Sequence, residues 1–144
     1  LEDAHFPQES FDVVTVWHTL EHLPDPKSTL KEINRLLKKE GLLVVATPNL
    51  SNHITRILYL IAKRKKLKLF SPQAKEWHLY HFSENTLSSM LKATGFKTIK
   101  KGPDLSQIET PKKIVDFLTV VVYFLTGKNF GQAMKFYALK QGEP

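Results

Sequence analysis

The stretch that most constrains the fold is Phe11–Pro48, in which a β-rich run, a polar turn, a helical pattern and a second β-rich run follow one another. The first run, Phe11–Trp17, is almost continuously apolar, which is typical of a strand in a parallel sheet that is covered on both faces. The second run, Leu42–Thr47, has the same character. Two such strands joined by a helix predict a right-handed βαβ unit.

The connecting helix has clear signals for its start and its end. Asp25 and Pro26 predict the beginning, because Asp caps helix N-termini and Pro suits the first helical position. Apolar residues then recur at helical spacing with lysines opposite. Gly41 is predicted to close the helix.

The rest of the chain predicts a larger α/β sheet within one domain. Because the first strand lacks an outer neighbour, we expect a further segment before Leu1, in the same gene product or supplied by a second copy. The further predicted elements are a helix over Ser51–Leu69, a helix from Ser83 to Gly95, a strand over Phe96–Lys101, a helix over Lys112–Thr126 and a strand over Phe130–Lys140.

Charge and composition narrow the class of protein. The chain has no cysteine, which excludes disulfides and a thiolate zinc site. Its net charge of +7 suits anionic partners, although a solvated basic helix face is equally consistent. The basic helix over Arg56–Phe70 suits a membrane surface, or packing on the sheet or on another subunit. Nucleic acid is a poor fit, because few aromatic residues are interleaved with its cations.

The longest apolar stretch, Ile114–Leu125, contains a charged residue and is shorter than the ~20 residues that a membrane span needs. No secretory signal is visible in Leu1–Ser10. We therefore expect a cytoplasmic protein, with peripheral contact to a membrane as an option.

The densest set of chemically capable side chains follows the first strand. His18, Glu21 and His22 stand at positions i, i+3 and i+4, which share one face of a helical or 3₁₀ turn. They lie just past the carboxyl end of a buried strand, where open α/β sheets bind ligands. Such a face suits a divalent metal or a general base with an orienting partner. The alternative is that Glu21 and His22 only hydrogen-bond the following loop.

A second cluster, Trp77–Phe82, follows the basic helix in a segment long enough to fold over the same edge of the sheet. His78 and His81 would join the first cluster as bases or ligands. The alternative is a loop that packs through its aromatic residues. The sequence contains no glycine-rich phosphate loop and no nucleophile elbow.

Several short motifs together resemble one family, the class I S-adenosylmethionine-dependent methyltransferases. The most similar groups are the ubiquinone-biosynthesis O-methyltransferase-like and the glycan-cluster methyltransferases, and the resemblance covers most of the chain. The motifs are Phe11-Asp12-Val13-Val14, Leu20-Glu21-His22-Leu23-Pro24-Asp25-Pro26, Leu36-Leu37-Lys38-Lys39-Glu40-Gly41, Thr47-Pro48-Asn49, His78-Leu79-Tyr80-His81-Phe82-Ser83, Leu87 and Gly95-Phe96.

The resemblance implies that residues 1–144 are the C-terminal half of a Rossmann-like, seven-stranded methyltransferase sheet with helices on both faces. The four predicted strands would be strands four to seven, of which the last is antiparallel. Residues 50–82 would be a variable cap or insertion. The glycine-rich cofactor loop would precede Leu1, so we expect this chain alone to bind the cofactor weakly or not at all.

The resemblance also implies where the cofactor would lie. Leu1 and Glu2 would be beside the adenine of S-adenosylmethionine. Trp17 and His18 would line the methionine end of the cofactor.

Some relatives carry Glu-x-x-Glu-His at this turn and use it for a divalent cation. In this sequence His18 replaces the first Glu, while Glu21 and His22 match. The implied metal set is therefore His18, Glu21 and His22, with His78 or His81 as an added ligand.

Two functions remain open at this point. The first is methyl transfer from S-adenosylmethionine to a hydroxyl, rather than an amine, of a small or lipid- or glycan-linked acceptor, with His18 or His78 as the base. The second is a non-catalytic basic module that binds a partner or a membrane surface. A homodimer is compatible with both.

Overall fold

The computed structural model describes residues 5–53, 56–57, 60–61, 64, 78–104 and 113–141, without the side chains of residues 113–116. Leu1, Glu2, Trp77 and most of the basic run fall outside these residues. The elements, in chain order, are β1 (Phe11–Trp17), the 3₁₀ turn η2 (Leu20–His22), α1 (Pro26–Leu36), β2 (Leu37–Pro48), α3 (Glu84–Ala93), β3 (Phe96–Pro103), α4 (Lys113–Thr126) and β4 (Ala133–Lys140).

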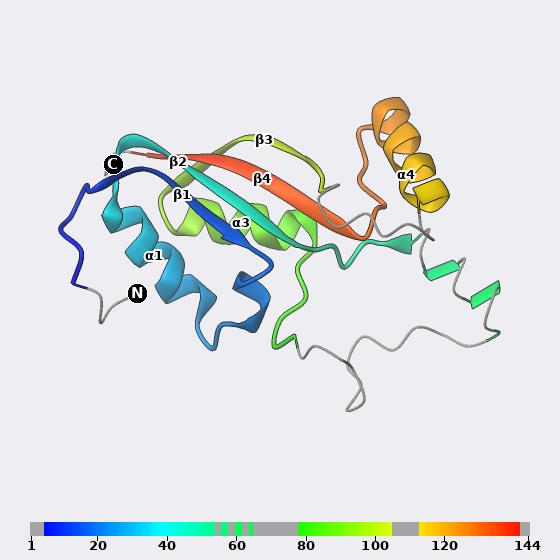
Figure 1. Cartoon of the computed structure of the whole chain (residues 1–144), viewed down its shortest axis with the longest axis horizontal. Helices are drawn as coiled ribbons and strands as arrows, with labels where there is room; N and C mark the ends of the chain where they lie inside the picture. Colours follow the sequence, from blue (N-terminus) through cyan, green and yellow to red (C-terminus); the bar gives the residue numbers. More distant parts are fainter. Residues whose placement is uncertain are drawn as a thin grey trace.

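The strands form one sheet in the order β1-β2-β4-β3 (Figure 1). β1 and β2 are parallel and are connected by α1, as the βαβ prediction requires. β4 lies between β2 and β3 and runs antiparallel to both. The last strand is therefore the antiparallel one, as the resemblance implied.

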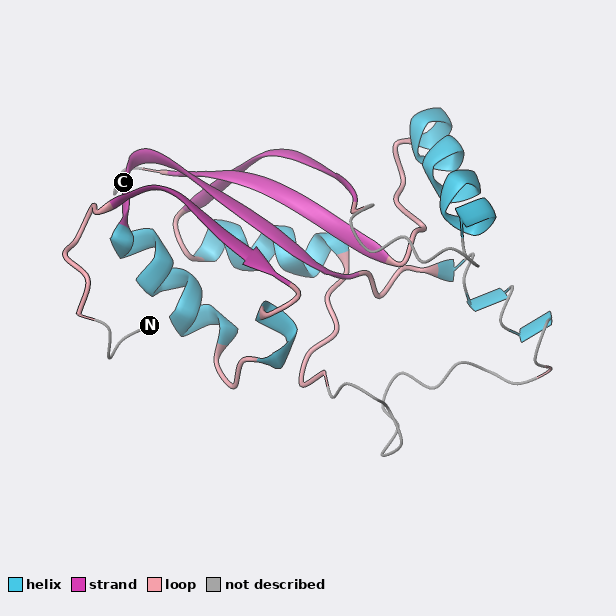
Figure 2. Ribbon diagram, viewed as in Figure 1, coloured by secondary structure: helices cyan, strands magenta, loops and turns pink. Residues whose placement is uncertain are grey.

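Helices α1 and α3 cover the same face of the sheet (Figure 2). The apolar side chains of these helices pack against the sheet. Alternate residues of each strand point to this face. Met134, Phe136 and Ala138 of β4 are completely buried there. This layer forms the hydrophobic core, whose buried members include Val16, Leu20, Leu30, Ile33, Leu37, Leu43, Val45, Phe82, Leu87, Leu91, Phe96, Met134, Phe136 and Ala138.

Among the described residues, the helix on the other face is α4, at the β3 end of the sheet. A cavity of about 220 Å³ between α4 and the sheet is lined by Tyr123 and by Lys135 and Tyr137 of β4. These two β4 residues alternate with the core residues and so mark the opposite face. The hydroxyl of Tyr123 donates to the carbonyl of Lys101 at 2.7 Å.

The predicted start of α1 is confirmed, because Asp25 Oδ1 accepts a hydrogen bond from the N–H of Ser28 at 2.9 Å. Its predicted end at Gly41 is wrong. The helix stops at Leu36, and β2 begins at Leu37, whose side chain is fully buried and which pairs with Phe11. Burial of Leu37 in the sheet overrides the helical pattern that continues in the sequence.

Gly41 has a different role from the predicted helix stop. A Cβ at this position would lie 2.8 Å from the carbonyl oxygen of Lys38, so only glycine fits the close approach of the backbone in this part of β2.

Candidate active site

The turn after β1 depends on an unusual backbone conformation at His18. Its φ of 43° lies in the left-handed region, which residues with a Cβ rarely adopt. The N–H of His18 donates to the carbonyl of Ala46 at 2.8 Å, which ties the turn to β2. Strain of this kind concentrates at functional sites.

Glu21 is the buried carboxylate of the site, with its side chain 1% exposed. The hydroxyl of Thr47 at the end of β2 donates to Glu21 Oε2 at 3.0 Å. Oε1 is also buried, and it has no hydrogen-bond partner within the part of the chain that the structure describes. Because a buried carboxylate oxygen without a hydrogen-bond partner is costly, Oε1 is suited to bind a cation.

The segment that carries the second histidine cluster docks directly on this turn. The backbone N–H of Leu79 donates to the carbonyl of Glu21 at 2.9 Å. This contact brings the ring centroids of His78 and His22 to 4.8 Å, and that of His81 lies 5.6 Å from His78. The two clusters therefore meet at one edge of the sheet.

Three side chains at this edge have the arrangement of a metal site. Among the described residues, one ligand atom each of Glu21, His22 and His78 lie within 4.8 Å of one another. His18, which the sequence placed in the metal set, is not part of this group. A carboxylate and two imidazoles suit zinc or another divalent transition metal better than Mg²⁺, which prefers oxygen ligands.

His18 lies instead between two buried carboxylates. Its Nδ1 is 3.6 Å from Glu21 Oε1, and its Nε2 is 3.3 Å from Asp104 Oδ2. The side chain of His18 is 16% exposed, whereas that of Asp104 is fully buried. The imidazole thus lies between two carboxylates, and the side chain of His18 keeps a small exposure to solvent.

Asp104 was missed by reasoning from the sequence, which took it for the first residue of a loop. It follows β3, which runs in the same direction as β1, so its side chain comes to the same edge of the sheet as His18. Lys135 Nζ is 3.5 Å from Asp104 Oδ1 and 5.1 Å from the ring centroid of Trp17. An acidic residue directly after a strand was the available signal, because such edges carry ligand sites.

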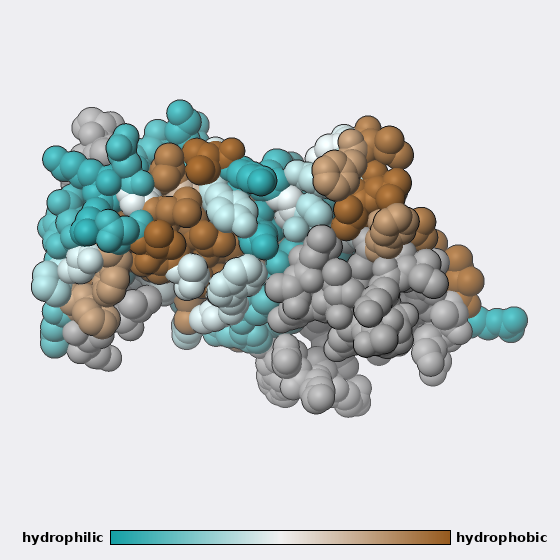
Figure 3. All heavy atoms as spheres, turned by 45° about the horizontal axis from the view of Figure 1, so that its top comes forward, coloured by the Kyte–Doolittle hydropathy of each residue, from teal (hydrophilic) through white to brown (hydrophobic). Residues whose placement is uncertain are grey.

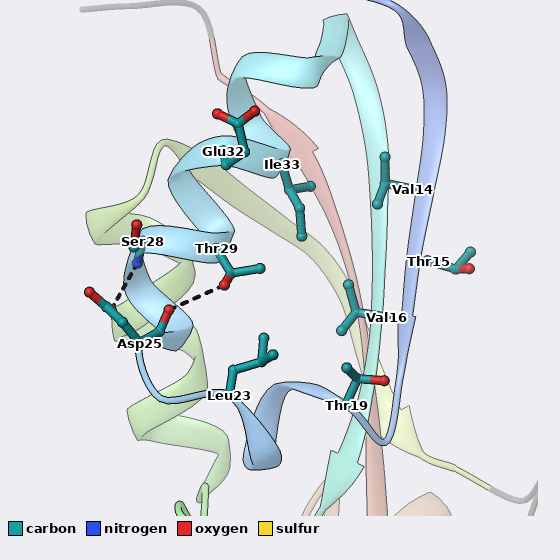
Figure 4. A pocket seen from close by; sticks show the side chains of 10 residues that line it. All are labelled: Val14, Thr15, Val16, Thr19, Leu23, Asp25, Ser28, Thr29, Glu32 and Ile33. Carbon is teal, nitrogen blue, oxygen red and sulfur yellow. Dashed lines mark hydrogen bonds between the residues drawn. The ribbon is translucent and has the colours of Figure 1, made fainter. Parts of the chain in front are cut away.

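A groove of about 660 Å³ between β1 and α1 lies apart from these histidines. Figure 4 shows that Val14, Val16 and Ile33 point into it, whereas Thr15 points away. Its walls hold few groups that could do acid–base or metal chemistry, so it is not the candidate active site.

Comparison of the chain with known proteins identifies its family. A family model described as a methyltransferase domain matches residues 1–101. A ubiquinone biosynthesis O-methyltransferase from Glaesserella parasuis serovar 5 is 44% identical over 41 residues, which are 28% of this chain and 17% of that protein. The chain therefore spans less than a fifth of the length of this curated relative.

Two solved structures are similar in fold. A chain from the complex between the Haloferax volcanii Trm112 methyltransferase activator and a methyltransferase superposes with a TM-score of 0.60 at 14% identity, over 97% of this chain and 58% of its own. The second is 1,6-didemethyltoxoflavin-N1-methyltransferase of Burkholderia thailandensis with bound 1,6-didemethyltoxoflavin and S-adenosylhomocysteine. Its TM-score is 0.56 at 16% identity, over 94% of this chain and 46% of its own.

The chain belongs to the methyltransferase domain family, and its sheet is a partial class I S-adenosylmethionine-dependent methyltransferase fold. This confirms the family and the fold class that the sequence motifs indicated. The comparisons do not favour the alternative of a non-catalytic module.

Proposed function

We propose that the protein containing this chain transfers a methyl group from S-adenosylmethionine to a hydroxyl of a small or lipid- or glycan-linked acceptor. The observation that carries the proposal is His18, held between Glu21 and Asp104 at the carboxyl edge of a parallel strand pair. This is the edge at which open α/β sheets bind their ligands.

The residues at this edge fit one wall of a cofactor site. The ring of Trp17 is 42% exposed, and His18 follows it at the end of β1. An exposed indole beside polar groups suits the sulfonium and methionine part of the cofactor. Leu1 and Glu2, proposed beside the adenine, lie outside the described residues. When bound, S-adenosylmethionine supplies the electrophilic methyl group.

His18 is proposed as the base for the acceptor hydroxyl. With Nε2–H directed to Asp104, Nδ1 would carry the lone pair that takes the proton of the acceptor. The two carboxylates stabilise the imidazolium that results. When the acceptor oxygen takes up the methyl group, its proton would move to His18. We prefer His18 to His78, because His78 belongs to the ligand group with Glu21 and His22.

The test of this role is His18→Ala in the intact protein. Loss of a general base is expected to lower turnover by about 10²–10⁴-fold, while the affinity for S-adenosylmethionine changes little. Turnover is measured as release of S-adenosylhomocysteine with a lipid extract or small phenols as acceptors, and affinity by calorimetry. His53→Ala is the control, because His53 packs near Phe130 outside the site. Unchanged turnover in His18→Ala would remove His18 from the mechanism.

We also propose that Glu21, His22 and His78 hold a divalent cation, which would position the acceptor oxygen. The supporting observation is the buried Glu21 Oε1 without a hydrogen-bond partner in the described region, within reach of two imidazoles. The residues present therefore fit a metal by donor type and by spacing.

The cation site is tested by titrating the intact protein with Zn²⁺ and Mn²⁺ in a calorimeter. Glu21→Gln and His78→Ala are expected to weaken binding at least about tenfold, since loss of even a supporting group around a metal costs about 10–100-fold. His53→Ala is the matched control and should bind the ion as the parent protein does, because His53 packs near Phe130 and not beside Glu21. Equal binding by all variants would mean that the ion, if any, is held elsewhere.

A further inference from the structure

Helix α4 has its apolar and polar faces reversed relative to a normal surface helix. The side chain of Thr119 is buried, and the hydroxyl of Tyr123 donates to the carbonyl of Lys101 in β3. Surface helices of water-soluble domains instead turn their apolar stripe to the core. The inward side of α4 thus carries two hydroxyl groups, and Val120 and part of Phe124 border the cavity between the helix and the sheet.

The outward face of α4 carries large apolar side chains. Their positions, i, i+1, i+4, i+7 and i+8, form one stripe along the helix. We call this stripe the α4 outer face. Its members and their exposed fractions are Phe117 67%, Leu118 49%, Val121 37%, Phe124 81% and Leu125 80%.

The same end of the molecule exposes a second set of apolar residues. Ile57, Leu60 and Ile61 are 57%, 44% and 69% exposed. The two regions are linked by the rings of His53 and Phe130, whose centroids are 6.0 Å apart. In Figure 3 the brown spheres of α4 stand at one end of the molecule, apart from the brown patch over the sheet. Exposed apolar patches of this kind mark interaction sites.

The charge of the chain is concentrated in the segments that contain these apolar residues. Residues 48–82 and 112–135 together contain 11 Lys and Arg but 2 Asp and Glu, whereas the rest of the chain contains 10 and 12. Among the described cations in these segments, Arg64 and Lys128 are exposed. The net positive charge of the chain therefore lies in the sequence segments that contain the exposed apolar residues.

No helix among the described residues is long and apolar enough to cross a bilayer.

We propose that the α4 outer face lies on the surface of an anionic phospholipid bilayer. Exposed Phe and Leu on one side of a helix suit the boundary between headgroups and acyl chains. The exposed Arg64 and Lys128, and the basic composition of the segments that contain them, suit anionic headgroups, which attract Lys and Arg within a Debye length. The sequence indicated a membrane contact through the basic helix over Arg56–Phe70. In the surface proposed here, α4 supplies the apolar side chains instead. The proposal does not depend on methyl transfer, since it concerns lipid contact alone.

The test is a flotation assay of the intact protein, without methyl donor, on vesicles of phosphatidylcholine alone or mixed with an equal part of phosphatidylglycerol. The parent protein is expected to float with the anionic vesicles, less so at high salt, and to stay unbound with phosphatidylcholine alone. The double variant Phe124→Glu, Leu125→Glu should lower the bound fraction at least about tenfold, because it places two charges in the apolar contact. The control is Ile99→Glu, which puts one such charge at a 53% exposed apolar position on β3.

Circular dichroism checks that the variants fold, and Phe124→Ser replaces the double variant if that one does not. The proposal is overturned if the parent protein does not bind anionic vesicles, or if the double variant binds as well as the parent. It is also overturned if the parent protein is a dimer that ignores vesicles and that the double variant converts to a monomer, since a second copy would then cover α4.

Discussion

Asn49 shows how one side chain holds the edge of the sheet that bears the site. Asn49 is only 2% exposed. Its side-chain NH₂ group donates to the carbonyls of Asn129 and Gly131 at 2.9 and 3.2 Å. Its Oδ1 accepts from the N–H of Ser51 at 2.9 Å. Asn49 therefore joins the end of β2 to the loop before β4, and a shorter polar residue could not reach all three groups.

At the same scale, Asp104 is expected to act through His18. Asp104→Asn keeps the size of the side chain but removes the carboxylate that fixes the imidazole. We expect turnover to fall about 10-fold or more, with the affinity for S-adenosylmethionine unchanged, because the base loses its orientation.

The double variant Asp104→Asn, His18→Ala separates positioning from a structural role. If Asp104 acts only by orienting His18, the double variant is no slower than His18→Ala alone, since coupled residues are non-additive. Additive losses of turnover would show that Asp104 acts independently of His18. Asp104 also faces Lys135, so the stability of each variant is measured alongside.

At the scale of elements, α3 is fixed by its N-terminus. The Ser83 hydroxyl accepts from the N–H of Thr86 at 3.2 Å, and Thr86 Oγ1 accepts from the N–H of Ser83 at 2.8 Å. This capping box orients the helix so that Leu87 and Leu91 reach the core. It also ends the segment that carries His78 and His81.

Loss of this cap is expected to destabilise the fold. Ser83→Ala should lower the free energy of unfolding by about 0.5–2 kcal/mol, as measured by urea denaturation. Ser89→Ala is the matched control at an exposed position inside α3, where Ala is at least as favourable as Ser. Equal losses in both variants would mean that the cap does not hold the helix.

At the scale of the whole molecule, β1 is an edge strand among the described residues. The groove beside it, lined by Val14, Val16 and Ile33, exposes apolar surface next to unpaired strand backbone. The resemblance to class I methyltransferases implies further strands on this side of the sheet, and the chain spans 17% of the length of its first curated relative. We therefore expect a further parallel strand to pair with β1 and its helix to fill the groove.

Hydrogen exchange on the intact protein measures this pairing. If a strand pairs with β1, the amides of β1 exchange as slowly as those of β2, because both strands are then hydrogen-bonded on two sides. Fast exchange of alternate amides in β1 would show that its outer edge stays open. The amides of β3 are an internal reference for an edge strand, since β3 ends the sheet on the other side in the described region.

The sequence determined most of the elements, because the signals for them are local. The valine-rich run of β1, the Asp25 cap and the alternation of Met134, Phe136 and Ala138 are read from neighbours in the chain. The short sequence motifs also indicated the methyltransferase family. The one clear error, the end of α1, arose where burial of Leu37 in the sheet outweighed a helical pattern.

The site itself was decided by the tertiary structure. The sequence named His18, Glu21, His22 and His78, but it could not say that His78 joins the ligand group while His18 turns to Asp104. That division depends on strand order and on the hydrogen bond from Leu79 to Glu21, which join residues far apart in the chain. The reversed face of α4 was hidden for the same reason: a helix pattern shows which residues share a face, but only packing decides which face meets the protein.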